Sequence, residues 1–576
     1  MNYALLSNGI TTALEKEGSI EWFPVPKFDS PSVFTKILDE DKGGYFLVTP
    51  EKFNRVKQHY VEYSLILRTE FDDGNLILID FLPLSLPAII RVYEAKVPFN
   101  VEVKPLFNYG LVNAGTETRK DGIIYKNPES KEGLELLING DYKINSPYRI
   151  TVNSGKGYLY LLYSRDLRYG LFSQKGFVYS EPYEAYSKLL YYSRKELERA
   201  RRPTIYENAF YRSLSVILGL IYKPSGGIIA SPTTSIPEIV GDERNWDYRY
   251  VWVRDSSYAI EALVKANLIT HARRALDFLT NLLDPSSKSF DHPFYSVDGT
   301  PPPAEENLDW LSGFMNSKPV RIGNAAYLQI QMDIEGAYMN ALYEYYKRTL
   351  DKDYVSSIFW AVEAISDWVS SSWRGESTDI WEERGISRHY THTKLMSWVA
   401  LDRASKLAKD LGYNKLSEEW KSRANEIKID ILSNGVKDSH HFVRYYGGDE
   451  IDAALLTLPL YDFIPATDSL FMNTLKKIEE ELRVADGLYL RYKKDFMGLA
   501  KNPFTLVTTW MARVYIRLKE FDRARWLLET LIMCNQDLGL IGEHVDPETC
   551  EARGNYPHLF PHSGMVLSIL EFDEVR

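Results

Sequence analysis

The sequence predicts a multidomain protein in which an N-terminal antiparallel β-sandwich precedes a C-terminal, all-α (α/α)6 toroid. Three observations lead to this fold class. The chain of 576 residues is too long for one ordinary hydrophobic core, so at least two domains are expected. The spacing of its apolar residues changes from strand-like to helical near residue 175. In the helical part, short and long connections alternate between the predicted helices.

Short β-rich segments fill the first part of the chain. The stretch "YSLILRTEFDDGNLILIDFLPL" holds two such runs around an Asp-Asp-Gly-Asn turn, and "IIRVYEAKVPFNVEVKPLF" and "GYLYLLYS" continue the period-two pattern. Because an antiparallel sandwich is the natural packing for many short strands, we expect a β-sandwich domain at residues 1–176. Residues 177–204 are helical and charged, and we expect them to form a helical linker.

The remaining residues, 205–576, have apolar side chains at helical spacing and are expected to form the catalytic domain. About twelve helices are predicted, near 207–221, 254–267, 271–283, 325–348, 354–371, 392–411, 415–433, 451–457, 467–481, 503–518, 521–534 and 561–573. Several connections are tight, which forces antiparallel neighbours and brings the long connections to one end. Six helical hairpins in a ring satisfy this requirement, and the long loops would then form one functional face.

Composition excludes several classes of protein. The net charge of −11 and the absence of a basic stripe argue against a nucleic-acid partner. The chain lacks a run of about 18 apolar residues and a signal-like start, so we expect no membrane partner and a cytoplasmic location. The two cysteines, Cys534 and Cys550, indicate no disulfide framework and are compatible with a reducing compartment. The scarcity of glutamine suggests a thermophilic source.

The first long loop of the helical part carries groups that suit sugar binding. For an isolated Arg254-Asp255 pair at a helix start, a capping or helix-dipole role would be the simpler interpretation. Tyr248 and Trp252 stand close by in sequence, and aromatic rings can cover the apolar face of a sugar while the charged groups bind its hydroxyls. The next long loop adds Trp310 as a further candidate for substrate binding.

Two other loops supply carboxylates that could act as a catalytic pair. Glu382 and Glu383 follow Trp381, which we also expect to bind substrate, and Glu543 lies in the last long loop, far away in sequence but on the same predicted face. Glycoside hydrolysis needs one protonated and one ionised carboxyl group on either side of the bond. We expect burial behind Trp381 and the like charge of Glu383 to raise the pKa of Glu382.

The expected surroundings of Glu543 differ from those of Glu382, because nearby Arg553 or His544 could keep Glu543 ionised. No metal or other cofactor is expected. His389 and His392 are three residues apart in an irregular segment without a clear third ligand, which is weak support for a metal site.

The loop motifs resemble the prokaryotic form of the glucoamylase family, glycoside hydrolase family 15. The matching stretches are "NWDYRYVWVRDSSY", "PVRIGNAAYLQIQMDIEGA", "DIWEERGISRHYTHTKLMSWVALDRA" and "GEHVDPETCEARGNYPHLFPHSG", together with "SNGITTALEKEGSIEWFPVPKFDSPSVFTKILD" near the N-terminus. The resemblance covers residues 7 to 567. It implies an N-terminal β-sandwich, an (α/α)6 barrel and an inverting, exo-acting hydrolase of α-glucosides that is often oligomeric.

The resemblance also implies roles for individual residues. Glu382 is similar to the family's general acid, and Glu543 is similar to its general base. Glu383, Trp252, Arg254 and Asp255 match positions that bind substrate, and Tyr248 matches an aromatic residue near the anomeric carbon. One departure is the Gly542-Glu543-His544 sequence around the base, where many relatives have other polar neighbours.

Several functions stay open on this scaffold. We expect a glucoamylase that releases β-glucose from maltooligosaccharides or starch, and the alternative is an α,α-trehalase. A phosphorylase would have no use for the water-activating carboxylate of Glu543. For a non-catalytic glucan-binding protein, the aromatic loops alone would suffice.

Overall fold

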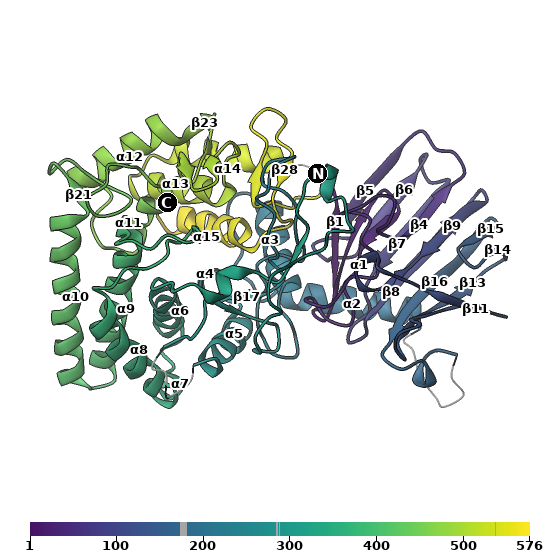
Figure 1. Ribbon diagram of the computed structural model, residues 1–576, viewed down its shortest axis with the longest axis horizontal. Coiled ribbons are helices and arrows are strands. Elements are labelled where there is room, and N and C mark those ends of the chain that lie inside the picture. Colours follow the sequence, from purple (N-terminus) through teal and green to yellow (C-terminus); the bar gives the residue numbers. More distant parts are fainter. Residues whose placement is uncertain (173–180, 284–285, 287–288, 536, 576) are drawn as a thin grey trace.

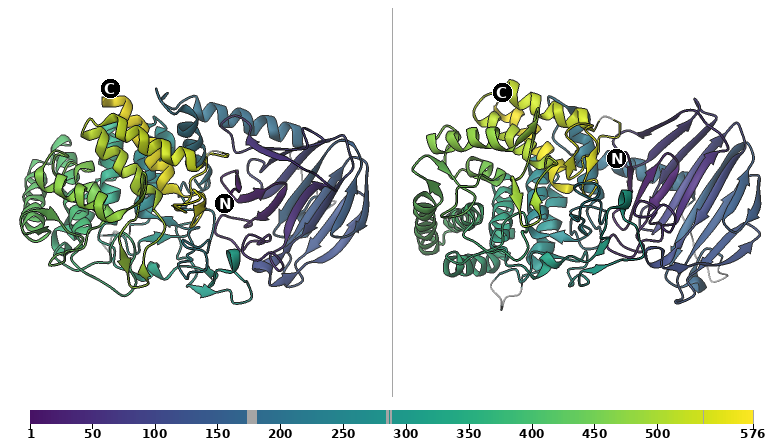
Figure 2. Two further views of the ribbon diagram at one scale, coloured as in Figure 1. Left: turned by 90° about the horizontal axis from the view of Figure 1, so that it is seen from above. Right: turned by 45° about the horizontal axis from the view of Figure 1, so that its top comes forward.

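A computed structural model describes the chain except residues 173–180, 284–285, 287–288, 536 and 576. An antiparallel β-sandwich and a helical part lie end to end in it (Figure 1). Helix α2 (Pro182–Leu197) runs along the sandwich (Figure 2, left) and packs Ala185 and Leu189 against the apolar side chains of one sheet. This helix falls within the predicted linker, whose first residues lie outside the described part. The domain limits at residues 176 and 204 stay predictions.

Two sheets form the sandwich. The seven-stranded sheet has the order β1 (Ala4–Ser7), β2 (Thr12–Lys16), β3 (Ser19–Trp22), β4 (Tyr45–Pro50), β9 (Phe99–Lys104), β15 (Arg149–Val152), β14 (Tyr142–Ser146). The eight-stranded sheet has the order β11 (Gly115–Arg119), β12 (Gly122–Lys126), β13 (Gly133–Asn139), β16 (Gly155–Ser164), β8 (Ala88–Ala95), β7 (Leu76–Phe81), β6 (Leu67–Phe71), β5 (Val56–Tyr60). Side chains of β9 alternate between buried and half-buried, as expected for strands with one face in the core. The predicted sandwich is confirmed.

The helical part is a ring of paired helices. The inner helices are α4 (Val253–Lys265), α6 (Ile334–Thr349), α9 (Thr391–Asp410), α11 (Thr457–Leu460), α13 (Thr505–Arg517) and α15 (Leu559–Val575). Each contacts the next, and α15 contacts α4, so the ring closes. The outer helices are α3 (Glu207–Gly219), α5 (Ile269–Asn281), α8 (Phe359–Ser372), α10 (Asn414–Asn434), α12 (Ser469–Leu482) and α14 (Phe521–Cys534). These contacts agree with the predicted (α/α)6 toroid.

Burial separates the inner helices from the outer ones. Helix α15 is buried on all sides along most of its length, as a helix surrounded by other helices must be. Helix α10 instead buries one stripe, which includes Trp420, Ala424 and Ile427. The difference follows from position, because an inner helix is covered by neighbours on all sides whereas an outer helix leaves one face exposed.

Three predicted helices differ from the observed ones. The segment 325–348 becomes helical only at Ile334, because Asn324 caps a short 3₁₀ turn at Ala325–Leu328 and the chain is extended at Gln329. The segment 354–371 is divided at Ile358 into α7 (Lys352–Ser357) and α8. The segment 451–457 is a 3₁₀ turn followed by the very short α11.

The sandwich and the helical ring are joined by buried polar contacts. Trp22 Nε1 donates a hydrogen bond to the carbonyl of Pro232 at 2.8 Å. The guanidinium of Arg249 donates to Ser30 O at 2.8 Å and to Tyr109 Oη at 2.9 Å. These contacts fix the first long loop of the ring against the sandwich, so the N-terminal domain supports the loops that carry the candidate site.

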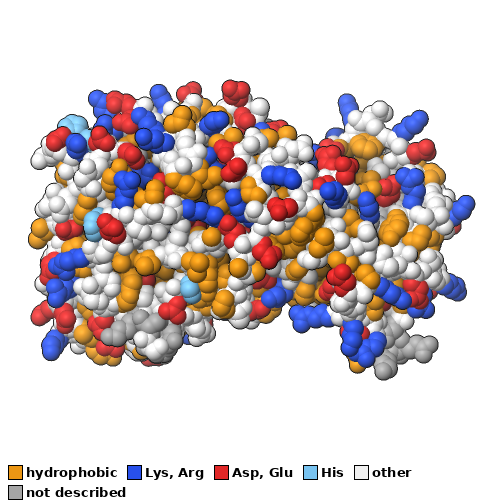
Figure 3. All heavy atoms as spheres, viewed as in Figure 1, with side chains coloured by type: hydrophobic (Ala, Val, Ile, Leu, Met, Phe, Trp, Pro, Cys, Tyr) orange, Lys and Arg blue, Asp and Glu red, His pale blue; other side chains and the backbone are white. Residues whose placement is uncertain are grey.

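Surface charge and helix hydropathy bear on the expected absence of nucleic-acid and membrane partners. On the face shown in Figure 3, acidic and basic side chains are interspersed and no basic stripe is visible. None of the helices in the described ranges is both long enough and apolar enough to span a bilayer.

Candidate active site

Seven of the nine residues predicted to act on substrate border one cavity of about 410 Å³, here named the first compartment. They come from three long loops and the start of α4, on the face that the sequence predicted. These residues are Tyr248, Trp252, Arg254, Asp255, Trp381, Glu382 and Glu543. The fold therefore brings together two carboxylates that are 161 positions apart in the chain, from 382 to 543.

Glu382 is held in an unusual backbone conformation. Its φ of +63° lies in the left-handed region, which is uncommon for residues other than glycine, and its N–H donates to Asp379 O at 3.0 Å in a tight turn. Its Oε1 accepts hydrogen bonds from Trp252 Nε1 at 2.7 Å and from the side chains of Arg254 and Gln331 at 3.0 Å each. With Oε1 fully engaged, a proton on this carboxyl group belongs on Oε2.

Arg254 ties Glu382 to the wall of the cavity. Its Nη1 donates to Gln331 Oε1 at 2.8 Å and to Asp333 Oδ2 at 3.1 Å, while its Nη2 binds Glu382. Asp255 is buried next to it, and burial raises the pKa of Asp255 to about 7 although the charge of Arg254 opposes that change. Oδ2 of Asp255 is buried with no hydrogen-bond partner among the described atoms, and Arg254 Nε lies 3.9 Å from it, so this oxygen can accept a hydrogen bond from a hydroxyl group.

Glu543 lies directly before β27 (His544–Val545) and is anchored through both its backbone and its side chain. Its backbone carbonyl accepts a hydrogen bond from Thr505 N at 3.0 Å. Oε1 accepts from Tyr248 Oη at 2.8 Å, and Oε2 accepts from Asn555 N at 3.3 Å. Gly554 has φ +68°, and a Cβ atom there would lie 2.5 Å from Glu543 Oε2, so the carboxylate needs glycine at this position.

The charges around Glu543 differ from those that the sequence predicted. Burial and the neighbouring carboxylate of Glu238 raise the pKa of Glu543 to about 8, against the opposing charge of Arg491. The predicted partner Arg553 pairs instead with Glu551 at 2.8 Å. Burial lowers the pKa of the other predicted partner, His544, to about 4, so it is neutral at pH 7 and cannot supply the charge. The expectation about the partners of Glu543 was therefore wrong.

Glu238, Glu543 and His544 form a buried cluster whose ligand atoms lie within 4.8 Å of one another. It is the only such group of potential metal ligands that the described ranges contain. Arg491 Nη2 already contacts both oxygens of Glu238, at 3.0 and 2.8 Å. The cationic guanidinium disfavours a metal ion there, and the cluster is best described as an ion-pair network behind Glu543.

A second compartment of about 450 Å³ adjoins the first. The two cavities share Tyr248, Trp381, Glu382 and Arg491 as lining residues, whereas Glu543 borders only the first. Glu383, a predicted substrate-binding residue, lines the second compartment. The site is therefore a pair of chambers that meet at Glu382.

Glu383 points away from the first compartment. Its Oε2 accepts hydrogen bonds from Tyr390 Oη and Arg444 Nη2, both at 3.2 Å. Burial raises the pKa of Glu383, and the charge of Arg444 opposes this change. Trp381 packs its ring against Phe504 and Trp510 and donates its indole N–H to Asp452 at 2.9 to 3.0 Å.

Trp310 does not line either compartment, contrary to the prediction that it binds substrate. Its Nε1 donates to Tyr109 O at 3.0 Å, and its own carbonyl accepts from Lys42 Nζ at 3.0 Å. Both partners belong to the N-terminal domain, so Trp310 is an interdomain contact. The pattern of aromatic residues in a long loop could not reveal which of them faces the other domain.

The two histidines considered as metal ligands have different surroundings. His389 is partly exposed and stacks on Tyr446, with ring centroids 6.0 Å apart. His392 is buried in α9, and burial lowers its pKa to about 4. It borders a further cavity that also contacts Arg254.

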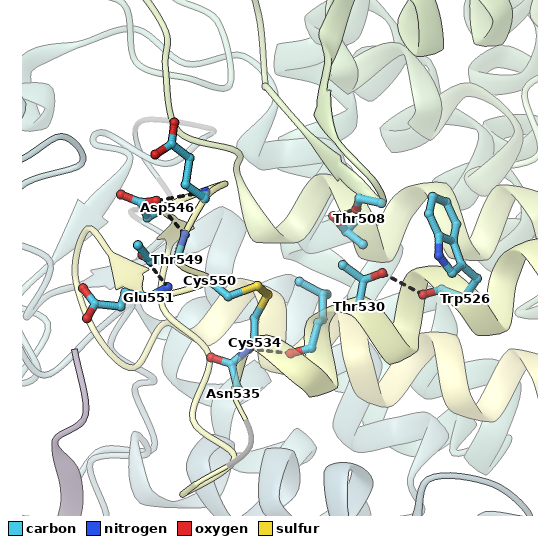
Figure 4. The surroundings of a disulfide bond; sticks show 12 residues. Thr508, Trp526, Thr530, Cys534, Asn535, Asp546, Thr549, Cys550 and Glu551 are labelled. Atoms are coloured by element: carbon cyan, nitrogen blue, oxygen red, sulfur yellow. Dashed lines mark hydrogen bonds between the residues drawn. A yellow bond between two sulfur atoms is a disulfide. The ribbon is translucent and has the colours of Figure 1, made fainter.

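The loop that carries Glu543 is closed by a disulfide bond between Cys534 and Cys550 (Figure 4). The prediction that the two cysteines form no disulfide was wrong, because spacing in a sequence cannot show that the end of α14 meets this loop. Asp546 Oδ1 accepts hydrogen bonds from the N–H groups of Glu548 and Thr549 at 3.0 Å each, which shapes the turn before Cys550. The bond attaches the loop to α14 and restricts the positions available to Glu543.

Several residues of the site carried little signal in the sequence. Glu238 stands in "SIPEIVGDER", where nothing distinguishes it from a surface acid. Arg491 stands in none of the matching motifs, although it borders both compartments and its charge acts on Glu543. Their pairing over a separation of 253 residues appears only in the fold.

Comparison with protein families gives two matches. Residues 204–570 match the family model described as glycosyl hydrolases family 15. Residues 2–140 match the model described as trehalase-like, N-terminal.

Individual relatives cover nearly the whole chain. It is 97% identical over 576 residues to "Trehalase 2" of Sulfolobus acidocaldarius, with 100% of both chains covered. It is 43% identical to "Trehalase 1" of the same organism, covering 98% of this chain and 97% of the relative. Among solved structures, a bacterial glucoamylase complexed with acarbose superposes with a TM-score of 0.73 at 15% identity, covering 100% of this chain and 94% of the other, which supports the fold.

Proposed function

The chain belongs to glycosyl hydrolase family 15 and is a glycoside hydrolase, and on this premise we propose that it is an inverting α,α-trehalase. The sequence alone favoured a glucoamylase, for which the comparisons give support only at the level of the family. The relatives at 97% and 43% identity are both named trehalases and support the alternative. The likeness to a solved glucoamylase, at 15% identity, concerns the fold alone.

The observation that carries this proposal is the pair of compartments that meet at Glu382. Trehalose consists of two glucose units, so each unit would occupy one compartment. The bond between them would then lie beside Glu382, which borders both chambers. Glu543 borders only the first compartment, where the glucose that is attacked would bind.

We assign the steps of the reaction from these positions. Glu382 donates the proton on Oε2 to the oxygen between the two units while the C1–O bond breaks. Glu543 accepts a proton from a water molecule whose oxygen forms the new bond to C1 from the opposite face. Inversion turns the attacked unit into β-glucose, whereas the departing unit keeps its α configuration. Arg254, Asp255 and Trp252 surround the attacked unit in this arrangement.

Position decides between the two roles. The pKa of Glu543 is raised to about 8, so this group has to lose its proton before it can act as a base. Of the two carboxylates, only Glu382 borders both chambers, as a donor to the bridging oxygen must.

The pH dependence of the reaction is expected to respond to Glu238. Its negative charge raises the pKa of Glu543, and a base is active only when ionised, so activity falls as the pH drops below that pKa. In Glu238→Gln the pKa of Glu543 falls and Arg491 is released to face it. The acidic limb of the pH profile of kcat/KM should therefore move to lower pH. The control is Glu243→Gln, which alters an exposed glutamate of the same loop and should leave the profile unchanged. A limb that stays in place or moves to higher pH would contradict this assignment.

Product analysis tests the proposed function. Purified protein is mixed with trehalose or with maltotriose, and the anomers are followed by NMR before mutarotation mixes them. We expect trehalose to be cleaved with equal initial amounts of α- and β-glucose, and maltotriose to be cleaved far more slowly.

Each other outcome points to a different enzyme. Preferential cleavage of maltotriose would restore the glucoamylase assignment. Two α-glucose molecules from each trehalose would mean retention and exclude Glu543 as a base. A requirement for phosphate, with glucose phosphate as a product, would indicate a phosphorylase, and tight binding without turnover would indicate a non-catalytic protein.

A further inference from the structure

Part of the wall of the second compartment is formed by a short hairpin. Strands β25 (Lys494–Asp495) and β26 (Gly498–Leu499) pair antiparallel, and Phe496 and Met497 form the turn between them. Asp495, Phe496 and Met497 all line the second compartment. Phe496 is nevertheless 48% exposed, so the same side chain faces the compartment and the solvent. The wall is therefore only one residue thick at this point.

A buried ion pair holds the base of the hairpin. Asp495 accepts hydrogen bonds from Arg244 Nη2 at 2.7 Å and from Tyr492 Oη at 2.6 Å. The side chains of Arg244 and Asp495 are 4% and 6% exposed, so this pair is shielded from water. Burial opposes the ionisation of Asp495, but the bonds from Tyr492 and Arg244 outweigh it and lower the pKa of Asp495. The carboxylate therefore stays charged and paired.

A second set of contacts attaches the hairpin to the acidic doublet. Phe496 N–H donates to Glu383 Oε1 at 3.1 Å, and Arg444 Nη1 donates to Lys494 O at 3.3 Å. Arg444 also binds Glu383, so the guanidinium connects the hairpin to the residue next to Glu382. The turn is thus fixed from two sides although its outer surface is exposed.

Another part of the wall of the second compartment is aromatic and charged. The guanidinium of Arg384 lies over the Trp246 ring at 4.2 Å from the centroid, and that of Arg321 lies over the same ring at 4.5 Å. Glu305 pairs with Arg384. A sugar in this chamber would contact both this part of the wall and the hairpin.

From this geometry we infer that the hairpin Lys494–Leu499 is a specificity element that restricts the departing group to a single glucose unit. The inference rests on the proposed function and names the part of the site that enforces it. A departing group with a further sugar attached would have to extend through the position of Phe496 and Met497. Two contacts oppose the displacement of that turn. They are the buried ion pair between Asp495 and Arg244 and the hydrogen bond from Phe496 N–H to Glu383.

The test uses a trisaccharide in which one glucose of trehalose carries an additional α-1,4-linked glucose. Cleavage of its 1,1 bond with the extended unit as the departing group releases α-maltose and β-glucose, whereas attack on the extended unit would release β-maltose and α-glucose, so maltose is counted here only as its α anomer. The wild-type protein is expected to cleave trehalose and to release almost no maltose from the trisaccharide. In Phe496→Ala/Met497→Ala, the ratio of kcat/KM for maltose release to that for trehalose cleavage should rise about tenfold or more.

Control variants distinguish the effect of the wall residues from the effect of other residues in the hairpin. Leu499→Ala changes an exposed residue of the same hairpin that does not line the compartment and should leave the ratio unchanged. Asp495→Asn weakens the buried ion pair with Arg244 but leaves Phe496 and Met497 unaltered in sequence, and it should raise the ratio because the turn is then more easily displaced. If the double variant fails to fold, Phe496→Ala alone provides the test, because half of that side chain is already in solvent.

The inference and the proposed function fail in different ways. If the wild-type protein does not cleave trehalose, the proposed function is wrong. If it cleaves trehalose and releases maltose from the trisaccharide equally well, only the role of the hairpin is refuted. An unchanged ratio in folded Phe496→Ala/Met497→Ala and Asp495→Asn would refute it too.

Discussion

Glu543→Gln is expected to lower kcat for trehalose by about 10²–10⁴-fold, the usual contribution of a general base. Glutamine has the shape of glutamate but cannot accept a proton from water. Its amide oxygen can accept from Asn555 N–H, and its NH₂ group can donate to Tyr248 Oη, so the hydrogen bonds around the site persist in altered form. KM should change little because Glu543 acts on water. Steady-state kinetics and a thermal melt check both statements.

A matched control and a rescue experiment complete this test. Glu548→Gln alters an exposed glutamate of the same loop and should retain wild-type activity. In Glu543→Ala, added azide should occupy the vacated space and attack C1 directly, giving β-glucosyl azide. A loss smaller than about tenfold in a folded Glu543→Gln protein would rule out this residue as the base.

The ring of helices could be predicted because its determinants are local. Apolar residues at spacings of three and four mark each helix, and the tight connections force antiparallel pairs. The predicted helix at 392–411, for example, is α9, Thr391–Asp410. Predictions failed where a local signal interrupted the pattern, as when Asn324 capped a short turn in front of α6.

The candidate site could be predicted in part, because the alternation of short and long connections can be read from the sequence. The loops that carry Glu382 and Glu543 were assigned to one face from the alternation of connections, and both residues border the first compartment. The network behind Glu543 could not be predicted, since Glu238 and Arg491 pair across most of the helical part. The same holds for Trp310, whose partner Tyr109 lies in the other domain.

The choice between substrates depends on the least predictable part of the molecule. Both a glucoamylase and a trehalase need a chamber for the attacked glucose, and its residues form recognisable sequence motifs. They differ in the chamber for the departing group, which here combines Trp246, Arg384 and Phe496 from three separate segments. No single stretch of sequence contains that chamber, so the motifs indicated the family and not the substrate.

Glu382→Gln should separate the two catalytic roles, because its effect is expected to depend on the leaving group. Glutamine keeps an oxygen that accepts the hydrogen bonds from Trp252, Arg254 and Gln331, but it has no acidic proton. Trehalose cleavage needs that proton for the departing sugar and should slow by about 10²–10⁴-fold. α-Glucosyl fluoride loses fluoride without protonation, so its hydrolysis should fall by no more than about tenfold. Initial rates on both substrates give the comparison.

Measuring Glu543→Gln on the same two substrates decides which residue is the acid and which is the base. A base is needed for either substrate, so Glu543→Gln should lose activity on trehalose and on the fluoride alike. If instead Glu543→Gln spares the fluoride and Glu382→Gln does not, the roles are reversed, an outcome in keeping with the raised pKa of Glu543 and the three donors on Glu382. In that case Glu543 would protonate the leaving group. Because Glu543 borders only the first compartment, the placement of trehalose across the two chambers would have to be abandoned.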